Sequence, residues 1–92
     1  MSWPGDVVAD YSRLVELLRE YGLELGLPHA RPIGGGLFEL RARGRDGIAR
    51  AFYCFARGRR VMILHAFVKK TQKTPLQELR IARRRQREVR DG

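Results

Sequence analysis

Cysteine, long apolar stretches and paired metal ligands are scarce or missing in this sequence of 92 residues. Its one cysteine, Cys54, lies in an apolar run and has no partner within the chain, so we expect a buried thiol in a reducing cytoplasm. No stretch approaches the roughly 20 apolar residues that cross a bilayer, and the N-terminus does not resemble a secretory signal. The sequence therefore predicts a cytoplasmic protein with no membrane segment.

Common catalytic motifs are also absent. There is no Gly-x-x-x-x-Gly-Lys-Ser/Thr loop, no Gly-x-Ser-x-Gly elbow and no pair of Cys or His at metal-ligand spacing. The glycines at 34–36 precede an expected strand and do not open a helix, so we interpret them as flexible backbone and not as a phosphate loop. We therefore expect neither a metal ion nor a cofactor.

Acidic residues are few in the second part of the chain. Residues 1–40 contain three basic and six acidic side chains, whereas residues 41–92 contain sixteen basic and four acidic ones. These parts carry net charges of −3 and +12 within a total of +9. Such an asymmetry favours a polyanionic partner, most often nucleic acid, and the alternative is a solvated surface that keeps the protein soluble.

Hydrophobic periodicity predicts an α+β fold in a single domain over residues 1–92. An N-terminal helix is expected from Asp6, as N-cap, to Tyr21, with Gly22 ending it. A connector rich in glycine and proline follows. Three antiparallel strands are then expected over 37–42, 48–56 and 60–68, because the intervening segments have hairpin lengths. A sheet of four strands is the alternative.

A basic C-terminal helix is expected over residues 75–90. Thr74 fits the N-cap, Pro75 the first helical position and Gln77 a capping box. The apolar face of this helix is thin, so we expect its last turns to fray or to be ordered by a partner. Its arginines predict nucleic-acid contacts, above all at Arg83, Arg84 and Arg87.

Charged residues on the three strands form the candidate site. They are Glu39 and Arg41 on one face of the first strand, Arg50 on the second, and Lys69, Lys70 and Lys73 at and after the end of the third. In an antiparallel meander these groups converge. Scission of RNA by attack of a 2′-hydroxyl on the adjacent phosphate needs a proton acceptor, cations for the dianionic transition state and a proton donor for the 5′-oxygen.

The chemical type of each of these residues predicts its role in such a reaction. Arg50 and Lys70 would stabilise the phosphate charge, Lys69 or Lys73 would donate the proton, and Glu39 would be the base. For Glu39 alone, an ordinary cross-strand ion pair with an arginine is the alternative. Replacing Arg50 by alanine is expected to remove cleavage and to leave the fold intact.

Histidine and aromatic residues allow two interpretations. His65 is as consistent with a semi-buried structural histidine as with an acid–base or RNA-contacting group, and Arg41 and Arg45 are further candidate RNA contacts. Phe67 and Tyr53 are expected in the core and not as stacking platforms for bases.

Three ordered blocks resemble the RelE/ParE toxin superfamily, and more narrowly its phage-derived, HigB-like branch. They are Gly-Leu-Phe-Glu-Leu-Arg at 36–41, Gly-Ile-Ala-Arg-Ala-Phe-Tyr at 47–53, and Leu-His-Ala-Phe-Val-Lys-Lys-Thr-Gln-Lys-Thr-Pro at 64–75. The likeness covers about residues 14–90. It implies a small α+β toxin that cleaves messenger RNA on the ribosome without a metal, and a cognate antitoxin, which we expect to be a helix-turn-helix protein encoded alongside.

By this resemblance Arg50 matches the most widely shared catalytic cation, and Lys70 matches the basic position at the end of the last strand. Two departures stand out. The tail over 76–92 has neither Tyr nor His, so His65, Tyr53 or a lysine would substitute for the C-terminal residue of many relatives. Relatives also usually begin with a strand before the helix, so either the start lies upstream or this domain is short.

Two other functions are compatible with the sequence. One is a non-catalytic, ParE-like toxin that inhibits DNA gyrase, and the other is a basic nucleic-acid-binding module without toxin activity. The three-block likeness favours cleavage of RNA.

Overall fold

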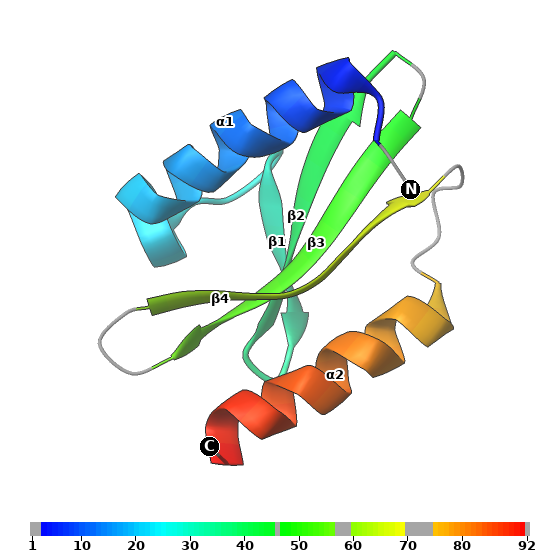
Figure 1. The fold of residues 1–92 in the computed structure, drawn as a ribbon. Helices are drawn as coiled ribbons and strands as arrows, with labels where there is room; N and C mark the ends of the chain where they lie inside the picture. Colours follow the sequence, from blue (N-terminus) through cyan, green and yellow to red (C-terminus); the bar gives the residue numbers. More distant parts are fainter. Residues whose placement is uncertain (1–2, 46, 57–59, 70–74, 92) are drawn as a thin grey trace.

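The computed structural model of the chain describes residues 3–45, 47–56, 60–69 and 75–91. The elements in chain order are the helix α1 (Gly5–Tyr21), the 3-10 turn η1 (Gly22–Glu24), the strands β1 (Ala30–Gly34), β2 (Leu37–Gly44), β3 (Gly47–Ala56) and β4 (Arg60–Lys69), and the helix α2 (Leu76–Asp91). The strands form one antiparallel sheet in the order β1-β2-β3-β4. Figure 1 shows the sheet between the two helices. The expected α+β fold and meander are confirmed.

The connector expected over 23–36 contains a strand that the sequence analysis did not assign. β1 pairs with β2 through a turn at Gly35 and Gly36, whose φ angles are 61° and 81°. Glycine adopts these left-handed angles without a Cβ clash, which allows the tight hairpin. Pro32 is tolerated because β1 is an edge strand, where a missing N–H breaks no central pairing. The alternative of four strands is therefore the correct one.

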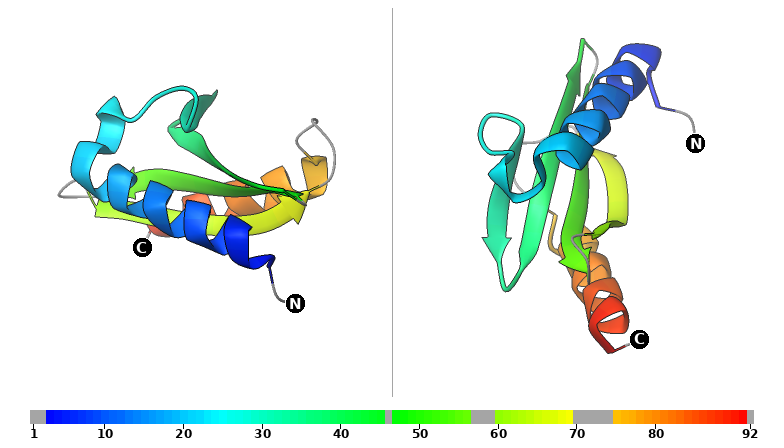
Figure 2. Two further views of the ribbon diagram at one scale, coloured as in Figure 1. Left: turned by 90° about the horizontal axis from the view of Figure 1, so that it is seen from above. Right: turned by 90° about the vertical axis from the view of Figure 1, so that its left-hand side faces the viewer.

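The helix α1 covers one face of the sheet (Figure 2). Its fully buried side chains are Val7, Leu14 and Leu18, which pack on Leu40 and Tyr53 and on alanines of β2 and β3. The alanines are small enough to let the helix approach the strands closely. Gly22 ends α1 with φ 56°, and its N–H donates to the Leu18 carbonyl, as expected from the sequence.

The helix α2 covers the opposite face, as the two views of Figure 2 show. The core on this side contains Leu37, Phe52, Cys54, Leu64 and Ala82, and burial raises the pKa of the Cys54 thiol above its usual value. This confirms the expectation of a buried cysteine. α2 begins at Leu76 and continues through Asp91, while the expected N-cap Thr74 lies outside the described residues.

Two aspartates of α1 hold the β2–β3 hairpin. Asp6, which the sequence analysis placed at the N-cap, lies inside the first turn, because the helix already begins at Gly5. Its Oδ2 accepts a hydrogen bond of 2.6 Å from the Arg45 backbone N–H, and Asp10 Oδ2 accepts one of 2.7 Å from that of Arg43. A Cβ at Gly44 would lie only 2.6 Å from Val7 Cγ2, so glycine permits this close approach.

We predict that the replacement Asp10→Asn lowers the free energy of unfolding by about 1 kcal/mol near pH 7, because the hydrogen bond from the Arg43 N–H then meets a neutral acceptor. Burial raises the pKa of Asp10, but the bonds from the Arg43 N–H and from Arg13 outweigh it and hold the pKa below 3.8. The carboxylate therefore contributes stability above its unfolded pKa, and this is lost as the pH falls through the folded pKa.

Urea unfolding from pH 3 to pH 7 measures this effect. The matched control is Glu16→Gln on the same helix, since Glu16 pairs with Arg19 and both side chains are 72% exposed. The control should change stability by less than about 0.5 kcal/mol. Equal effects of the two variants at pH 7 would contradict the role of Asp10.

Candidate functional site

Strand register gathers the charged candidates on the α2 side of the sheet. Across the strands, Arg31 lies opposite Glu39, and Arg41 lies opposite Arg50. Because Glu39 and Arg41 are two residues apart on β2, both pairs face the same side. On β4, His65 pairs with Phe52, the residue opposite Glu39, and Phe67 pairs with Arg50. The structure thus brings together the three strand residues that the sequence analysis expected to converge.

Glu39 is the centre of this group. Its side chain is 0% exposed, and Arg50, at 1%, is equally buried. Arg50 Nη1 donates to both carboxylate oxygens, at 3.1 Å to Oε2 and 3.4 Å to Oε1, and Arg31 Nε donates to Oε1 at 3.0 Å. The carboxylate thus joins β2 to arginines of both neighbouring strands. We name the group Arg31, Glu39, Arg41 and Arg50 the arginine cluster.

Arg41 makes none of the hydrogen bonds to Glu39 that Arg31 and Arg50 make. No described residue accepts a hydrogen bond from its Nε, although this atom is buried. Burial, followed by the nearby Arg50 guanidinium, lowers the pKa of Arg41 below its usual value, and Glu39 opposes this. The cluster contains three guanidinium groups and one carboxylate, so positive charges exceed negative ones by two. A buried donor beside excess positive charge favours an anionic ligand.

His65 lies beside the cluster and is held by the helix α2. Its Nε2 bonds to Glu78 Oε2, and Arg85 Nη1 lies 3.4 Å from its Nδ1. A carboxylate accepts and a guanidinium donates, so these contacts favour the tautomer that carries its proton on Nε2. The ring stacks on Phe67 at 5.7 Å, and the side chain is 18% exposed. His65 is therefore a semi-buried histidine on the face of the cluster.

The other candidate cations lie in different places. Lys69 is the last residue of β4, but its side chain, like Lys70 and Lys73, lies outside the described residues. Arg45 is exposed in the β2–β3 turn. Arg83 is an anchor of α2, because its Nη1 donates to the Gly34 carbonyl at 2.8 Å.

A row of exposed arginines runs along α2. Its members are Arg80, Arg84 and Arg87, spaced four and three residues apart, and we name them the arginine stripe. The spacing places them on one side of the helix, away from Ala82 and Gln86, which are buried against the sheet. Of the three helical arginines expected to contact nucleic acid, Arg84 and Arg87 thus lie on the exposed side.

Sequence reasoning missed two members of this region, Arg31 and Glu78. Arg31 fell in the supposed connector, yet the glycine pair at 35–36 before an alternating strand is a hairpin signal that predicts β1. Glu78 had no such signal, because its contact with His65 depends on how α2 packs. Tyr53, considered as a substitute for a missing C-terminal residue, packs on the α1 side and stacks on Phe38. Burial raises its pKa to about 12.

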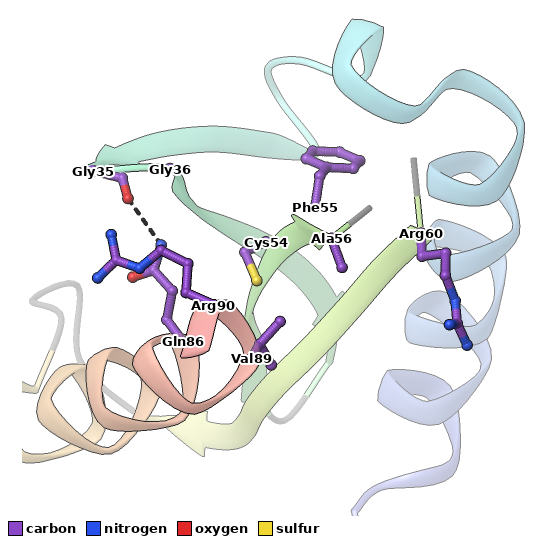
Figure 3. Close-up of a pocket in the computed structure, with 9 residues that line it drawn as sticks. All are labelled: Gly35, Gly36, Cys54, Phe55, Ala56, Arg60, Gln86, Val89 and Arg90. Atoms are coloured by element: carbon purple, nitrogen blue, oxygen red, sulfur yellow. Dashed lines mark hydrogen bonds between the residues drawn. The ribbon is translucent and has the colours of Figure 1, made fainter. Parts of the chain in front are cut away.

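A separate pocket of about 500 Å³ lies further along the same face (Figure 3). It lies between the last turns of α2, the β1–β2 turn and the end of β3, where Gln86 Nε2 donates to the Gly35 carbonyl. Cys54 and Val89 make its wall apolar, and Arg90 adds a charge. None of the described residues that line this pocket belongs to the arginine cluster.

Two kinds of arrangement are absent from the part of the chain that the structure describes. No three His, Cys, Asp or Glu side chains in residues 3–45, 47–56, 60–69 and 75–91 gather as a metal ion would require. Neither described helix has the length and apolar character needed to cross a membrane.

The fold is a small α+β domain in which an N-terminal helix, a four-stranded antiparallel sheet and a C-terminal helix follow one another. A model of the family described as Phage derived protein Gp49-like (DUF891) matches residues 1–87, and the chain belongs to this family. Proteins of this family are commonly toxins of toxin–antitoxin systems, which supports a toxin role and an antitoxin partner. No curated protein matches the chain.

The burial of Glu39 and Arg50 changes what we expect from the replacement of Arg50. Removing Arg50 leaves a buried carboxylate with less compensation, so we now expect a cost to the fold, in contrast to the intact fold expected from the sequence. We predict that Arg50→Met and Glu39→Gln each lower the free energy of unfolding, by up to about 3–5 kcal/mol for a broken buried pair. The double variant should lose clearly less than the sum of the two.

Urea unfolding of the parent, the two single variants and the double variant gives the coupling energy between Glu39 and Arg50. The control cycle uses Glu16 and Arg19, whose exposed pair should couple by less than about 1 kcal/mol. Additive effects of Glu39→Gln and Arg50→Met would show that the two side chains do not stabilise one another.

Proposed function

We propose that this chain is a toxin of the HigB-like branch that cleaves messenger RNA on the translating ribosome, without a metal ion. The observation that carries the proposal is the arginine cluster: its excess positive charge and the buried Nε of Arg41 fit a phosphate diester. Family membership supports a toxin, and the cluster supports a phosphate-containing target. The high basic charge of residues 41–92 supports RNA as the source of that phosphate.

The proposed reaction forms one bond to phosphorus and breaks another. The 2′-oxygen attacks the adjacent phosphorus while a base takes its proton. The bond to the 5′-oxygen then breaks and an acid protonates the leaving oxygen. The products are a 2′,3′-cyclic phosphate and a 5′-hydroxyl. Negative charge grows on the phosphate oxygens in the transition state, where guanidinium groups stabilise it best.

Burial and contacts divide this work among the described residues. Arg41 and Arg31, whose side chain is 42% exposed, contact the phosphate oxygens. Arg50 is a positioning residue, because it lies behind them and binds Glu39. Glu39 holds the arginines and is not the base, since two guanidinium groups already occupy its oxygens.

Proton transfer falls to His65 and to the lysines after β4. His65 lies on the face of the cluster, and Glu78 orients its ring through Nε2. Arg85 Nη1 lies 3.4 Å from Nδ1, so proton transfer at Nδ1 requires the substrate to displace this guanidinium. Lys69, Lys70 and Lys73 keep the roles expected from the sequence: Lys70 adds charge at the phosphate, and Lys69 or Lys73 is the alternative proton donor.

Docking on the ribosome uses the arginine stripe of α2. Its exposed side chains follow one side of the helix, as contacts along a ribosomal RNA backbone require, and such binding is driven largely by counterion release. The cognate antitoxin, a helix-turn-helix protein encoded beside the toxin, is the partner that neutralises it.

Arg41→Gln tests the function without breaking the buried pair, because Arg41 makes none of the hydrogen bonds to Glu39 described above. We predict that it lowers the rate of ribosome-dependent cleavage by about 10²-fold, as loss of one preorganised donor does, with little change in stability. Primer extension on messenger RNA in a purified translation system measures the rate.

The control is Arg13→Gln, on the other face of the sheet, which should cleave like the parent. Free RNA should stay intact with every variant, because the ribosome orders the substrate. Rapid cleavage of free RNA would contradict the dependence on the ribosome, and full activity of Arg41→Gln would remove the cluster from the site.

A further inference from the structure

The two edges of the sheet differ in how well they are protected. β1 has five residues, contains Pro32 and pairs irregularly near Gly34. β4, the other edge, has ten residues without a proline; its pairing with β3 also shifts register, between Ile63 and His65, so that Arg60–Ile63 is the regular stretch before the shift. Edge strands carry backbone N–H and C=O groups that can pair with another chain, and proline or short length usually prevents this. β4 is the edge that remains open to a further strand.

An apolar hollow lies beside the first half of β4, on the α1 side. Its volume is about 500 Å³, and Val15, Leu18, Val61 and Ile63 line it. A second hollow of about 570 Å³ adjoins it and shares Leu18 and Val61. Ile63 is 38% exposed and lines the first hollow from β4. A strand added along β4 would place alternate side chains over these hollows.

The charged residues beside the first hollow indicate what kind of partner would bind there. Arg19, whose side chain is 72% exposed, and the exposed Arg60 both line the first hollow, and none of the described residues that line it is acidic. Glu20 and Glu24 line the second hollow, and Glu16 pairs with Arg19 at the surface. Two copies of a chain with net charge +9 repel one another, and each would bring the same arginines to a shared β4 edge. An acidic segment would instead pair with them. Charge complementarity therefore favours an acidic partner over a second copy.

We propose that β4, over Arg60–Ile63, accepts an extended segment of the antitoxin as an additional antiparallel or parallel strand, with apolar side chains in the hollow and acidic ones at Arg19 and Arg60. This inference rests on the proposed toxin function. The added strand ends near Leu64, because the Leu64 carbonyl already accepts a hydrogen bond of 2.8 Å from Arg85 Nη1. The surface is distinct from the arginine cluster, which lies on the α2 side of the sheet.

Hydrogen exchange tests the proposal, with the purified protein encoded beside the toxin gene as the probe. Binding should slow exchange in peptides from β4 and leave β1 peptides unchanged. Ile63→Glu should weaken binding at least tenfold, because it removes an apolar contact and repels acidic side chains. Val8→Glu is the matched control, since Val8 is 43% exposed on α1 and lines neither hollow.

Arg19→Glu is a second variant that does not alter the strand, and it too should weaken binding at least tenfold. Both variants should still cleave messenger RNA like the parent. Tight binding that neither slows exchange in β4 nor depends on Ile63 and Arg19 would overturn this inference and leave the toxin function standing. No binding by the neighbouring protein would overturn this inference and the assignment of that protein as antitoxin, whereas the cleavage assay tests the toxin function separately. Protection of β4 by self-association of the chain would overturn the inference and assign the edge to a second copy.

Discussion

A buried carboxylate constrains the α2 side of this protein. Glu39 is fully buried in the middle of the sheet, and a charge there is stable only while its partners remain in place. Arg50 supplies one partner from β3, and Arg31 supplies another from β1. The ion pairs thus join three strands and fix the guanidinium groups around one point. The same arrangement leaves Arg41 with a buried Nε that no described residue accepts from.

The two faces of the sheet are built differently. The α1 face has a continuous apolar core, in which alanines allow close packing of the helix. The α2 face is divided between an apolar part around Phe52 and the charged cluster. α2 depends on polar contacts to complete its thin apolar face, with Arg83 and Gln86 bound to carbonyls of the β1–β2 turn. Charge is thereby concentrated on the face that the proposed function uses.

The sequence predicted the elements whose apolar residues recur at a clear period. Both helices and the strands β2, β3 and β4 agree with the structure to within one or two residues. β1 was missed because proline and glycine hide a short edge strand. The alternation of side chains along the strands also placed Glu39, Arg41 and Arg50 on one face of the sheet. It does not indicate how deeply a side chain is buried, so the burial of Arg50 was not predicted. The contact of His65 with Glu78 depends on the packing of α2, which no local pattern encodes.

The central claim is that the cluster promotes attack of a 2′-hydroxyl on the adjacent phosphate of ribosome-bound messenger RNA. The most direct test maps a cleavage site in a purified translation system and then replaces the 2′-hydroxyl on its 5′ side by hydrogen. The account predicts that cleavage at that site disappears, while other sites in the same molecule are still cut and leave 2′,3′-cyclic phosphate ends. Continued cleavage at the 2′-deoxy position, or the absence of any cleavage by the parent protein, would contradict it.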